Sequence, residues 1–253
     1  MSRLHPIFAL LAVCLAPSVQ AQLIYPRNGV EVPDGARVTL KPVKEKFILG
    51  ESIVARFIVN NDSRKEFKIS YGGDYRGGAR QARFKVSAEG PDGENVADPY
   101  PGDFNFGGIG GSPSVRPGES WTSSLALQRY LRFDKPGRYT IRVKHDLGWK
   151  DTPEKPVPEG KASIEIVLPN ADQAEELLKS LEKPRDGNAR STVDDAAPTL
   201  DPAALAYPVY LPLLVPRIGA GKIDYLGSIE NIETVEATAA LVGLLKSTDA
   251  KVS

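Results

Sequence analysis

Cysteine is almost absent from this chain, because Cys14 is the only one in 253 residues. It lies in an apolar run that follows a basic start at Arg3 and precedes a small-x-small cleavage site at Val19–Ala21, which is the pattern of a secretory signal peptide. We therefore predict a signal peptide over residues 1–21 and a secreted or periplasmic protein. Without Cys14 the mature chain has no disulfide, no thiolate nucleophile and no cysteine-ligated zinc. Its stability must then come from its core.

The chain also lacks an excess of charge of either sign. It has 32 Lys and Arg residues against 32 Asp and Glu residues, and signal removal takes away only Arg3, which leaves 31 against 32 and a net charge of −1. Nucleic-acid-binding domains are usually basic, so we predict no nucleic-acid partner. The apolar run over residues 6–16 is too short for a permanent transmembrane helix. We expect no integral membrane segment once the signal is removed.

Glycine and proline are frequent, with 23 and 21 residues, which indicates many turns and a β-rich protein. Between the turns, apolar and polar residues alternate with the period of a strand that has one buried face. Such segments begin near residues 38, 53, 67, 82, 121, 139 and 164. About seven strands at this spacing are typical of an antiparallel immunoglobulin-like β-sandwich. We predict this sandwich over residues 37–169, after an N-terminal arm over residues 22–36.

The most regular of these segments is Phe133–Lys144. Pro136 and Gly137 form a turn, and apolar residues alternate with polar ones from Tyr139 onward. A tyrosine at the start of a strand after such a turn matches the tyrosine corner of immunoglobulin-like sandwiches, in which the phenol hydroxyl bonds to upstream backbone. We predict that Tyr139 fixes a corner in this way.

After Pro169 the pattern changes to that of helices. Asn170 can cap a helix with one apolar stripe, and Pro184 ends it. The polar residues that follow have the composition of a flexible linker. Residues 170–199 are therefore predicted to be a helix and a linker.

Residues 200–253 predict a short α-helical segment. Three prolines interrupt its first apolar stretch, which must be kinked or segmented: Pro208, Pro212 and Pro216. The last helix, at about Thr234–Lys246, is apolar over too wide an arc for a lone helix in water. The fold class we predict is mainly β with an α tail.

Two parts of the chain carry a family resemblance. They are Gly72–Gly77, Asp98–Gly111 and Phe133–Trp149 in the sandwich, and Glu233–Val252 in the tail. They resemble exported bacterial proteins, largely uncharacterised, in which an immunoglobulin-like domain is followed by HEAT-type helical repeats. The tail is similar to the first helix and turn of a HEAT repeat, so the repeat region is incomplete in this sequence. Repeat stacks need about three units to bury their faces. We therefore expect either a truncated protein or a tail that packs on the sandwich or on another chain.

One adjacent pair, His145 and Asp146, has the residue types of a base and the carboxylate that orients it. Adjacent residues on a strand point to opposite faces, so these two cannot easily share a hydrogen bond. We interpret His145 as a polar residue at a strand end. The sequence contains no other constellation of catalytic groups, and we predict that the protein is not an enzyme.

Two further patterns have structural alternatives. Gly107–Ser112 has the glycines of a phosphate loop, but it lacks the Lys-Ser/Thr and the helix that should follow, so we interpret it as a loop that crosses close over a sheet edge. Oxygen ligands for calcium are offered by four loop carboxylates, Asp92, Glu94, Asp98 and Asp103. Their order is not that of an EF-hand, and solvated loop carboxylates are common. We predict no metal and no cofactor.

Aromatic and arginine side chains gather in two glycine-rich loops, near residues 71–80 and 98–111, and Trp149 follows the Tyr139 strand. Such side chains on the loops of a rigid sandwich can form a recognition surface. The alternative is that they cover the open ends of the core. We expect a binding site, if the chain has one, to consist of Asp74, Tyr75, Arg76, Arg80, Tyr100, Phe106 and Trp149.

These features predict an exported, non-enzymatic binding or scaffold protein that acts through protein–protein contacts. Two alternatives remain, an accessory domain of a larger envelope enzyme or assembly, and a protease inhibitor. The partner is predicted to be a protein. The wide apolar arc of the last helix also allows self-association through the C-terminal helices.

Overall fold

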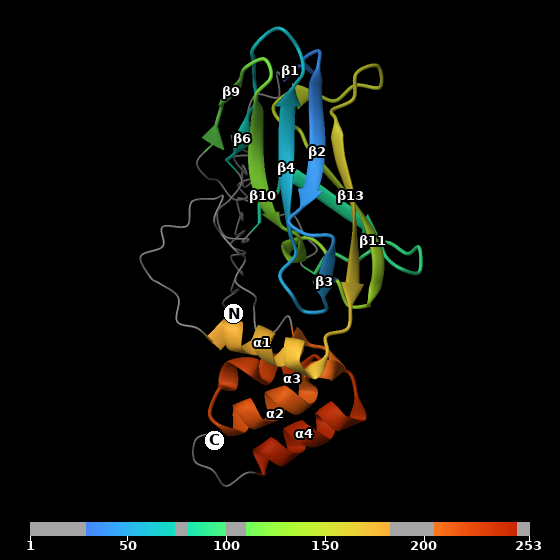
Figure 1. Cartoon of the computed structure of the whole chain (residues 1–253), viewed down its shortest axis with the longest axis vertical. Helices are drawn as coiled ribbons and strands as arrows, with labels where there is room; N and C mark the ends of the chain where they lie inside the picture. Colours follow the sequence, from blue (N-terminus) through green and yellow to red (C-terminus); the bar gives the residue numbers. More distant parts are fainter. Residues whose placement is uncertain (1–28, 74–79, 100–109, 183–204, 247–253) are drawn as a thin grey trace, which may run out of the picture.

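Two β-sheets form the larger part of the molecule, and a group of short helices forms its C-terminal end (Figure 1). The computed structural model describes residues 29–73, 80–99, 110–182 and 205–246. Within them the predicted fold class, mainly β with an α tail, is confirmed.

The first sheet has three antiparallel strands in the order β10 (Ser120–Ala126), β4 (Val54–Asn61) and β2 (Ala36–Pro42). The alternation in the sequence determines which face is buried, since Phe57 and Val59 are 0% exposed and pair with Leu40 and Val38 of β2. The residues between them face outward and are polar or partly exposed.

The second sheet has four strands in the order β3 (Lys46–Ile48), β13 (Glu159–Val167), β11 (Gly137–His145) and β7 (Phe84–Glu89). The pairing of β3 with β13 is parallel and the other two pairings are antiparallel. Strand β13 ends at Val167, and the next residue, Leu168, is 58% exposed.

Three two-stranded ladders lie beside these sheets. They pair β1 (Val30–Glu31) with β12 (Trp149–Lys150), β5 (Phe67–Lys68) with β9 (Ser114–Val115), and β6 (Tyr71–Gly72) with β8 (Gly110–Gly111). The single strand predicted near residue 67 is therefore divided in two. The predicted arm and the predicted loop after residue 98 each contain a short strand.

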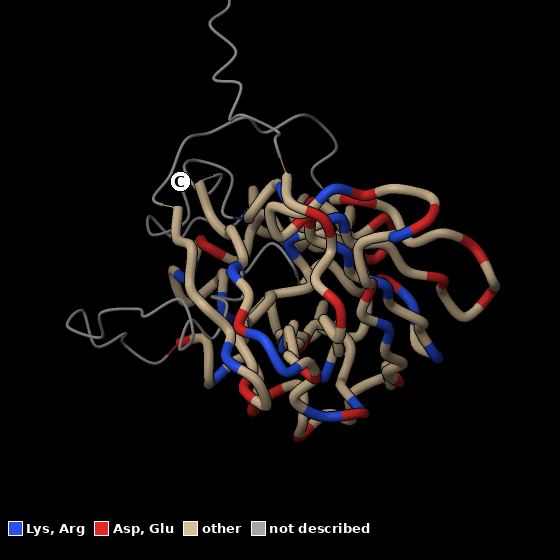
Figure 2. The backbone as a smooth tube through the Cα atoms, turned by 90° about the horizontal axis from the view of Figure 1, so that it is seen from above, with Lys and Arg blue, Asp and Glu red and all other residues tan. Residues whose placement is uncertain are grey.

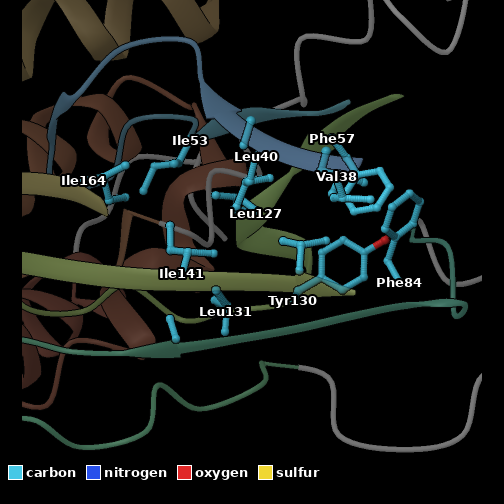
Figure 3. Packing of buried hydrophobic residues seen from close by; sticks show 14 of the residues in the cluster. Val38, Leu40, Ile53, Phe57, Phe84, Leu127, Tyr130, Leu131, Ile141 and Ile164 are labelled. Carbon is cyan, nitrogen blue, oxygen red and sulfur yellow. The ribbon is translucent and has the colours of Figure 1, made fainter. Parts of the chain in front are cut away.

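Both main sheets and the ladders contribute to one hydrophobic core. Figure 3 shows side chains of this core from both sheets pointing toward one another, with Phe57 of β4 near Phe84 of β7. Tyr139 closes the core at a corner: its hydroxyl donates a hydrogen bond to the carbonyl oxygen of Lys135 at 2.7 Å. The predicted corner hydrogen bond is confirmed.

The helices form a second core. They are α1 (Ala171–Glu182), η3 (Pro208–Tyr210), α2 (Leu211–Gly219), η4 (Ile223–Tyr225), α3 (Leu226–Glu230) and α4 (Val235–Leu245). The predicted cap of α1 is confirmed, because the Asn170 side chain accepts from Gln173 N and the Gln173 side chain accepts from Asn170 N. Helix α1 packs with α2–α4, and Arg217 of α2 contacts both Glu175 (2.8 Å) and Glu182 (2.9 Å) of α1.

The two cores meet at a junction formed by two tyrosines. Tyr210, 0% exposed, donates a hydrogen bond from its hydroxyl to Leu49 O at 2.5 Å, and the Tyr207 hydroxyl bonds to Phe133 O. Tyr207 packs against both cores. Gly50 leaves room for this contact, because a Cβ there would lie 3.0 Å from Leu205 and from the Tyr210 hydroxyl. At this junction the tail packs on the β-sheet part of the molecule, which is one of the alternatives expected for it.

Candidate functional site

The two glycine-rich loops predicted to carry the binding site are described only at their bases. Five of the predicted residues, Asp74, Tyr75, Arg76, Tyr100 and Phe106, lie outside the described residues. The backbone that enters and leaves both loops is described, and it forms one connected group of residues. We call this group the loop platform: Tyr71–Gly73, Arg80–Gln81, Asp98 and Gly110–Gly111.

One side of the platform is the β6–β8 ladder. Tyr71 pairs with Gly111 and Gly72 with Gly110, so the entry to the first loop is bonded to the exit of the second. The Tyr71 ring lies over Gly111, where a Cβ would be 2.6 Å from the ring, and it packs against Trp121 of β10 at 5.0 Å. The glycine at position 111 therefore lets the aromatic ring fix the ladder against the first sheet.

The other side of the platform is an ion pair. Nη1 of Arg80 donates to both carboxylate oxygens of Asp98, at 2.8 and 2.9 Å, and to Arg129 O at 3.2 Å. Its guanidinium lies 5.5 Å from the ring centre of Tyr130, whose hydroxyl bonds to both backbone groups of Gln81. The exit of the first loop is thus bonded to the entry of the second.

Arg83 extends this network toward the turn after β11. It donates to Ser70 O and Gly72 O, each at 3.0 Å, and its Nε donates to Asp146 at 3.1 Å. Although burial would raise the pKa of Asp146, the hydrogen bond from Arg83 holds that pKa below its ordinary value. Asp146 also accepts from Gly148 N at 2.9 Å, so its carboxylate is used to hold the turn.

His145 is not part of a catalytic pair. Its Nδ1 accepts a hydrogen bond from Leu147 N at 2.8 Å and lies 4.0 Å from the Asp146 carboxylate. The ring is 0% exposed and lies 4.5 Å from the Phe84 ring, and burial lowers its pKa to about 3. A neutral imidazole with no access to solvent cannot take a proton from a substrate. The interpretation of His145 as structural agrees with this geometry.

Trp149 does not belong to an exposed loop surface, so this part of the predicted site is wrong. The side chain is 4% exposed, packs edge-on against Phe67 at 5.6 Å, and donates from Nε1 to Lys68 O at 3.3 Å. The turn at Leu147 and Gly148, both with positive φ, directs it inward. The burial of Trp149 agrees with the alternative given for these aromatics, that they cover the core. Its partner strand is β1, in the predicted arm.

Arg80 lies at the platform as predicted for a loop residue, but its role there is structural, since its side chain is 10% exposed and paired with Asp98. The sequence gives no local signal for this pair, because the two residues are 18 positions apart.

Asp98 was among the carboxylates considered for calcium. Another of them, Asp92, pairs with Lys135 at 2.7 Å, and Asp103 lies outside the described residues.

The described ranges contain neither a metal-binding cluster nor a membrane-spanning helix. Among the described residues, no three His, Cys, Asp or Glu side chains gather closely enough to hold a metal ion. No helix within those ranges is long and apolar enough to cross a membrane. Figure 2 shows basic and acidic residues interspersed along the described backbone.

No family model matches this chain, and no curated protein matches it. Solved structures similar to it include a β-glucosidase from Listeria innocua, with a TM-score of 0.27, 13% identity and coverage of 52% of this chain. The chain spans 16% of that enzyme's length. The CARDB domain of a Pyrococcus furiosus protein gives a TM-score of 0.28 at 8% identity, over 56% of this chain and 97% of that one. Similarity at this level gives no evidence about the function of this chain.

Proposed function

We propose that this protein is an exported, non-enzymatic binding or scaffold protein that recognises another protein through its two glycine-rich loops. The main observation that supports this proposal is the loop platform. The described residues at the ends of the two loops are bonded to each other on both sides. Loops that start from one rigid base suit a composite recognition surface. The loops supply the residue types that dominate protein interfaces, tyrosine, phenylalanine and arginine: Tyr75, Arg76, Tyr100 and Phe106.

We further propose that the scaffold is an immunoglobulin-like sandwich. Strands β2, β4 and β10 then correspond to A, B and E, and β7, β11 and β13 to C, F and G. The corner tyrosine, Tyr139, stands at the start of β11, where strand F of such sandwiches has it. In this assignment the first glycine-rich loop lies in the B–C connection, one of the loops that antibody variable domains use for binding. The helical end is proposed to be a HEAT-like segment.

A non-enzymatic role is supported by the state of the charged groups near the platform. Arg80, Arg83 and Asp146 all bond to groups of the protein itself, and His145 is buried and neutral. These side chains stabilise the scaffold and leave no positioned acid or base on it. Export through the signal peptide of residues 1–21 is part of the same proposal.

Chemical crosslinking to the native cell envelope or medium tests this function. The protein starting at Gln22 is compared with two loop variants, Tyr75→Ala/Arg76→Ala and Tyr100→Ala/Phe106→Ala. Arg138→Ala is the matched control, since Arg138 is exposed on β11 in the second sheet. We expect a partner that is recovered with the unmodified protein and with the control, and about tenfold less with each loop variant. Equal recovery with all four proteins, each with an unchanged melting temperature, would contradict the proposal.

A further inference from the structure

Helix α4 has two apolar faces, and the described residues of the protein cover only one of them. Ala237 is 1% exposed and packs into the helical core together with Leu241 and Leu244. On the other side, Val235 is 82% and Val242 43% exposed, and Leu245, at the C-terminal end of the helix beside Leu241, is 86% exposed. A single exposed apolar side chain is ordinary, but three on one 11-residue helix need an explanation.

The exposed residues form a ridge along the helix. Val235, Ala239 and Val242 follow the i, i+4, i+7 spacing, so they share one face. The ridge lies opposite Ala237 on the helix, since successive residues turn by about 100°. Next to it, Gly243 has nothing within 4 Å of the position a Cβ would take. Small residues at 239 and 243 allow a second backbone to approach closely.

An apolar groove continues this face on one flank. It lies between α4 and the segment formed by η3 and α2, with a volume of about 580 Å³, and Glu236 and Ala240 form its α4 side. Its other wall consists of Pro208, Leu211, Pro212, Val215 and Pro216. Prolines have no backbone N–H to satisfy, so this wall can be covered by an apolar surface at little cost.

We propose that this face of α4 binds the same face of a second copy of the chain, with the two helices antiparallel. Charge selects this occupant and this orientation. Glu233 and Glu236 lie at the N-terminal end of α4, and Lys246 caps its C-terminal end. In an antiparallel pair Glu236 of each copy faces Lys246 of the other and the helix dipoles are opposed, which is favourable at both ends. A parallel pair would place glutamates against glutamates.

The same charges disfavour a lipid surface as the occupant. A helix that lies on a membrane is usually basic on its polar face, whereas α4 has Glu236 in its first turn and is preceded by Glu230 and Glu233. The position of α4 also suits a dimer, because the helix lies at the end of the molecule away from the sheets (Figure 1). Two copies can meet there without contact between their sheets.

The small size of the proposed contact between two α4 helices limits the affinity of the dimer. An 11-residue helix is about 16 Å long, which is short compared with interfaces that bury about 800 Å² per partner. We therefore expect a reversible dimer whose population rises with protein concentration in the micromolar range or above.

Charge exchange tests the proposed contact in the protein starting at Gln22. Sedimentation velocity over a concentration series should detect the dimer, and Glu236→Lys or Lys246→Glu alone should weaken self-association about tenfold, because each change occurs twice in a symmetric interface. A mixture of the two variants should form a heterodimer about as strong as the unmodified dimer. Helix content by circular dichroism shows that the variants remain folded. A monomer at every concentration, or a mixture no better than the single variants, would overturn the proposal.

Single-cysteine variants test the orientation, since the chain without residues 1–21 has no cysteine of its own. With a two-fold axis between residues 239 and 242, the two copies of Ala239→Cys lie about 4 Å apart along the helices, and those of Val235→Cys about 16 Å. We expect Ala239→Cys to form a disulfide-linked dimer and Val235→Cys to form very little of one. Equal self-crosslinking of Ala239→Cys and Val235→Cys would indicate a parallel pair and overturn the antiparallel assignment.

Discussion

His145, a single buried side chain, makes the stability of this protein depend on pH. Its imidazole is neutral in the folded protein, with a pKa lowered to about 3 mainly by burial, whereas an unfolded histidine has a pKa of about 6.5. Below pH 6.5 the unfolded chain therefore binds a proton that the folded chain does not. The stabilisation is complete above pH 6.5 and is lost as the pH falls toward 3.

We expect the free energy of unfolding to fall by about 2 kcal/mol between pH 6.5 and pH 5, measured by urea denaturation at each pH. This range separates His145 from Asp146, whose pKa lies below the ordinary carboxyl value and which titrates at lower pH. His145→Asn is the control, because its side chain can still accept the bond from Leu147 N but does not titrate. If the free energy of unfolding of this variant depended on pH with the same slope, groups other than His145 would be the cause of the pH dependence.

The Tyr139 hydroxyl is a second residue whose contribution can be measured alone. Besides donating to Lys135 O, it accepts from Lys135 N at 3.3 Å, while the ring packs edge-on against Phe133 at 5.1 Å. Tyr139→Phe keeps the ring and removes both hydrogen bonds, so we expect a loss of about 1 kcal/mol in the free energy of unfolding. An unchanged urea midpoint would show that the corner bond contributes nothing.

Among the elements, the turn between β3 and β4 determines how the helices dock on the sheets. Gly50 has φ +86° and lies against Leu205 and Tyr210, whereas Gly93 has φ +75° with nothing within 4 Å. Gly→Ala at either site costs about 1 kcal/mol of backbone strain, but only at position 50 does the new methyl group also collide with the helical core. We expect Gly50→Ala to accelerate hydrogen exchange in α1–α3 and Gly93→Ala to leave that exchange unchanged. Equal effects would indicate that the junction tolerates the methyl group.

The long elements could be predicted from the sequence and the short ones could not. Strands β4, β11 and β13 extend over eight or nine residues, enough for the alternation to appear, and α4 has its cap at Thr234 and a helical period. The two-residue strands β1, β6 and β8 have no period to detect. They form because a partner from elsewhere in the chain lies beside them. The loop platform depends on such contacts, so its geometry was not accessible from the sequence.

In the molecule as a whole, the sheets have a core of their own and the helices add to it at one junction. A protein that ends at residue 169 keeps all the described residues of the larger core except Tyr207, which is only partly buried. We expect this truncated protein to fold, with lower stability, because it loses the hydrogen bonds from Tyr207 and Tyr210. The near-ultraviolet circular dichroism of its buried aromatics and a cooperative urea transition check this. Insoluble or non-cooperative protein would show that the sheets need the helices.

The junction between the two cores also could not be predicted from the sequence. The expectation of a truncated protein, or of a tail that packs on the sandwich or on another chain, rested on the incomplete HEAT-like repeat, which does not indicate the surface that the tail contacts. The bond from Tyr210 to Leu49 joins residues 161 positions apart. Both of its atoms belong to groups that are common in any protein, a phenol and a backbone carbonyl.

The contact of α1 with α2 changes what a cut in the chain would do. Residues 170–199 were interpreted as a helix and a flexible linker before a separate helical segment, but α1 lies in the same core as α2–α4 and is held there by Arg217 through Glu175 and Glu182. The segment that joins α1 to that core is residues 183–204. The segment therefore starts and ends on one unit. Hydrolysis of a peptide bond within it would divide the covalent chain into two pieces that stay assembled, so a nicked protein would migrate as two fragments under denaturing conditions and as one species under native ones.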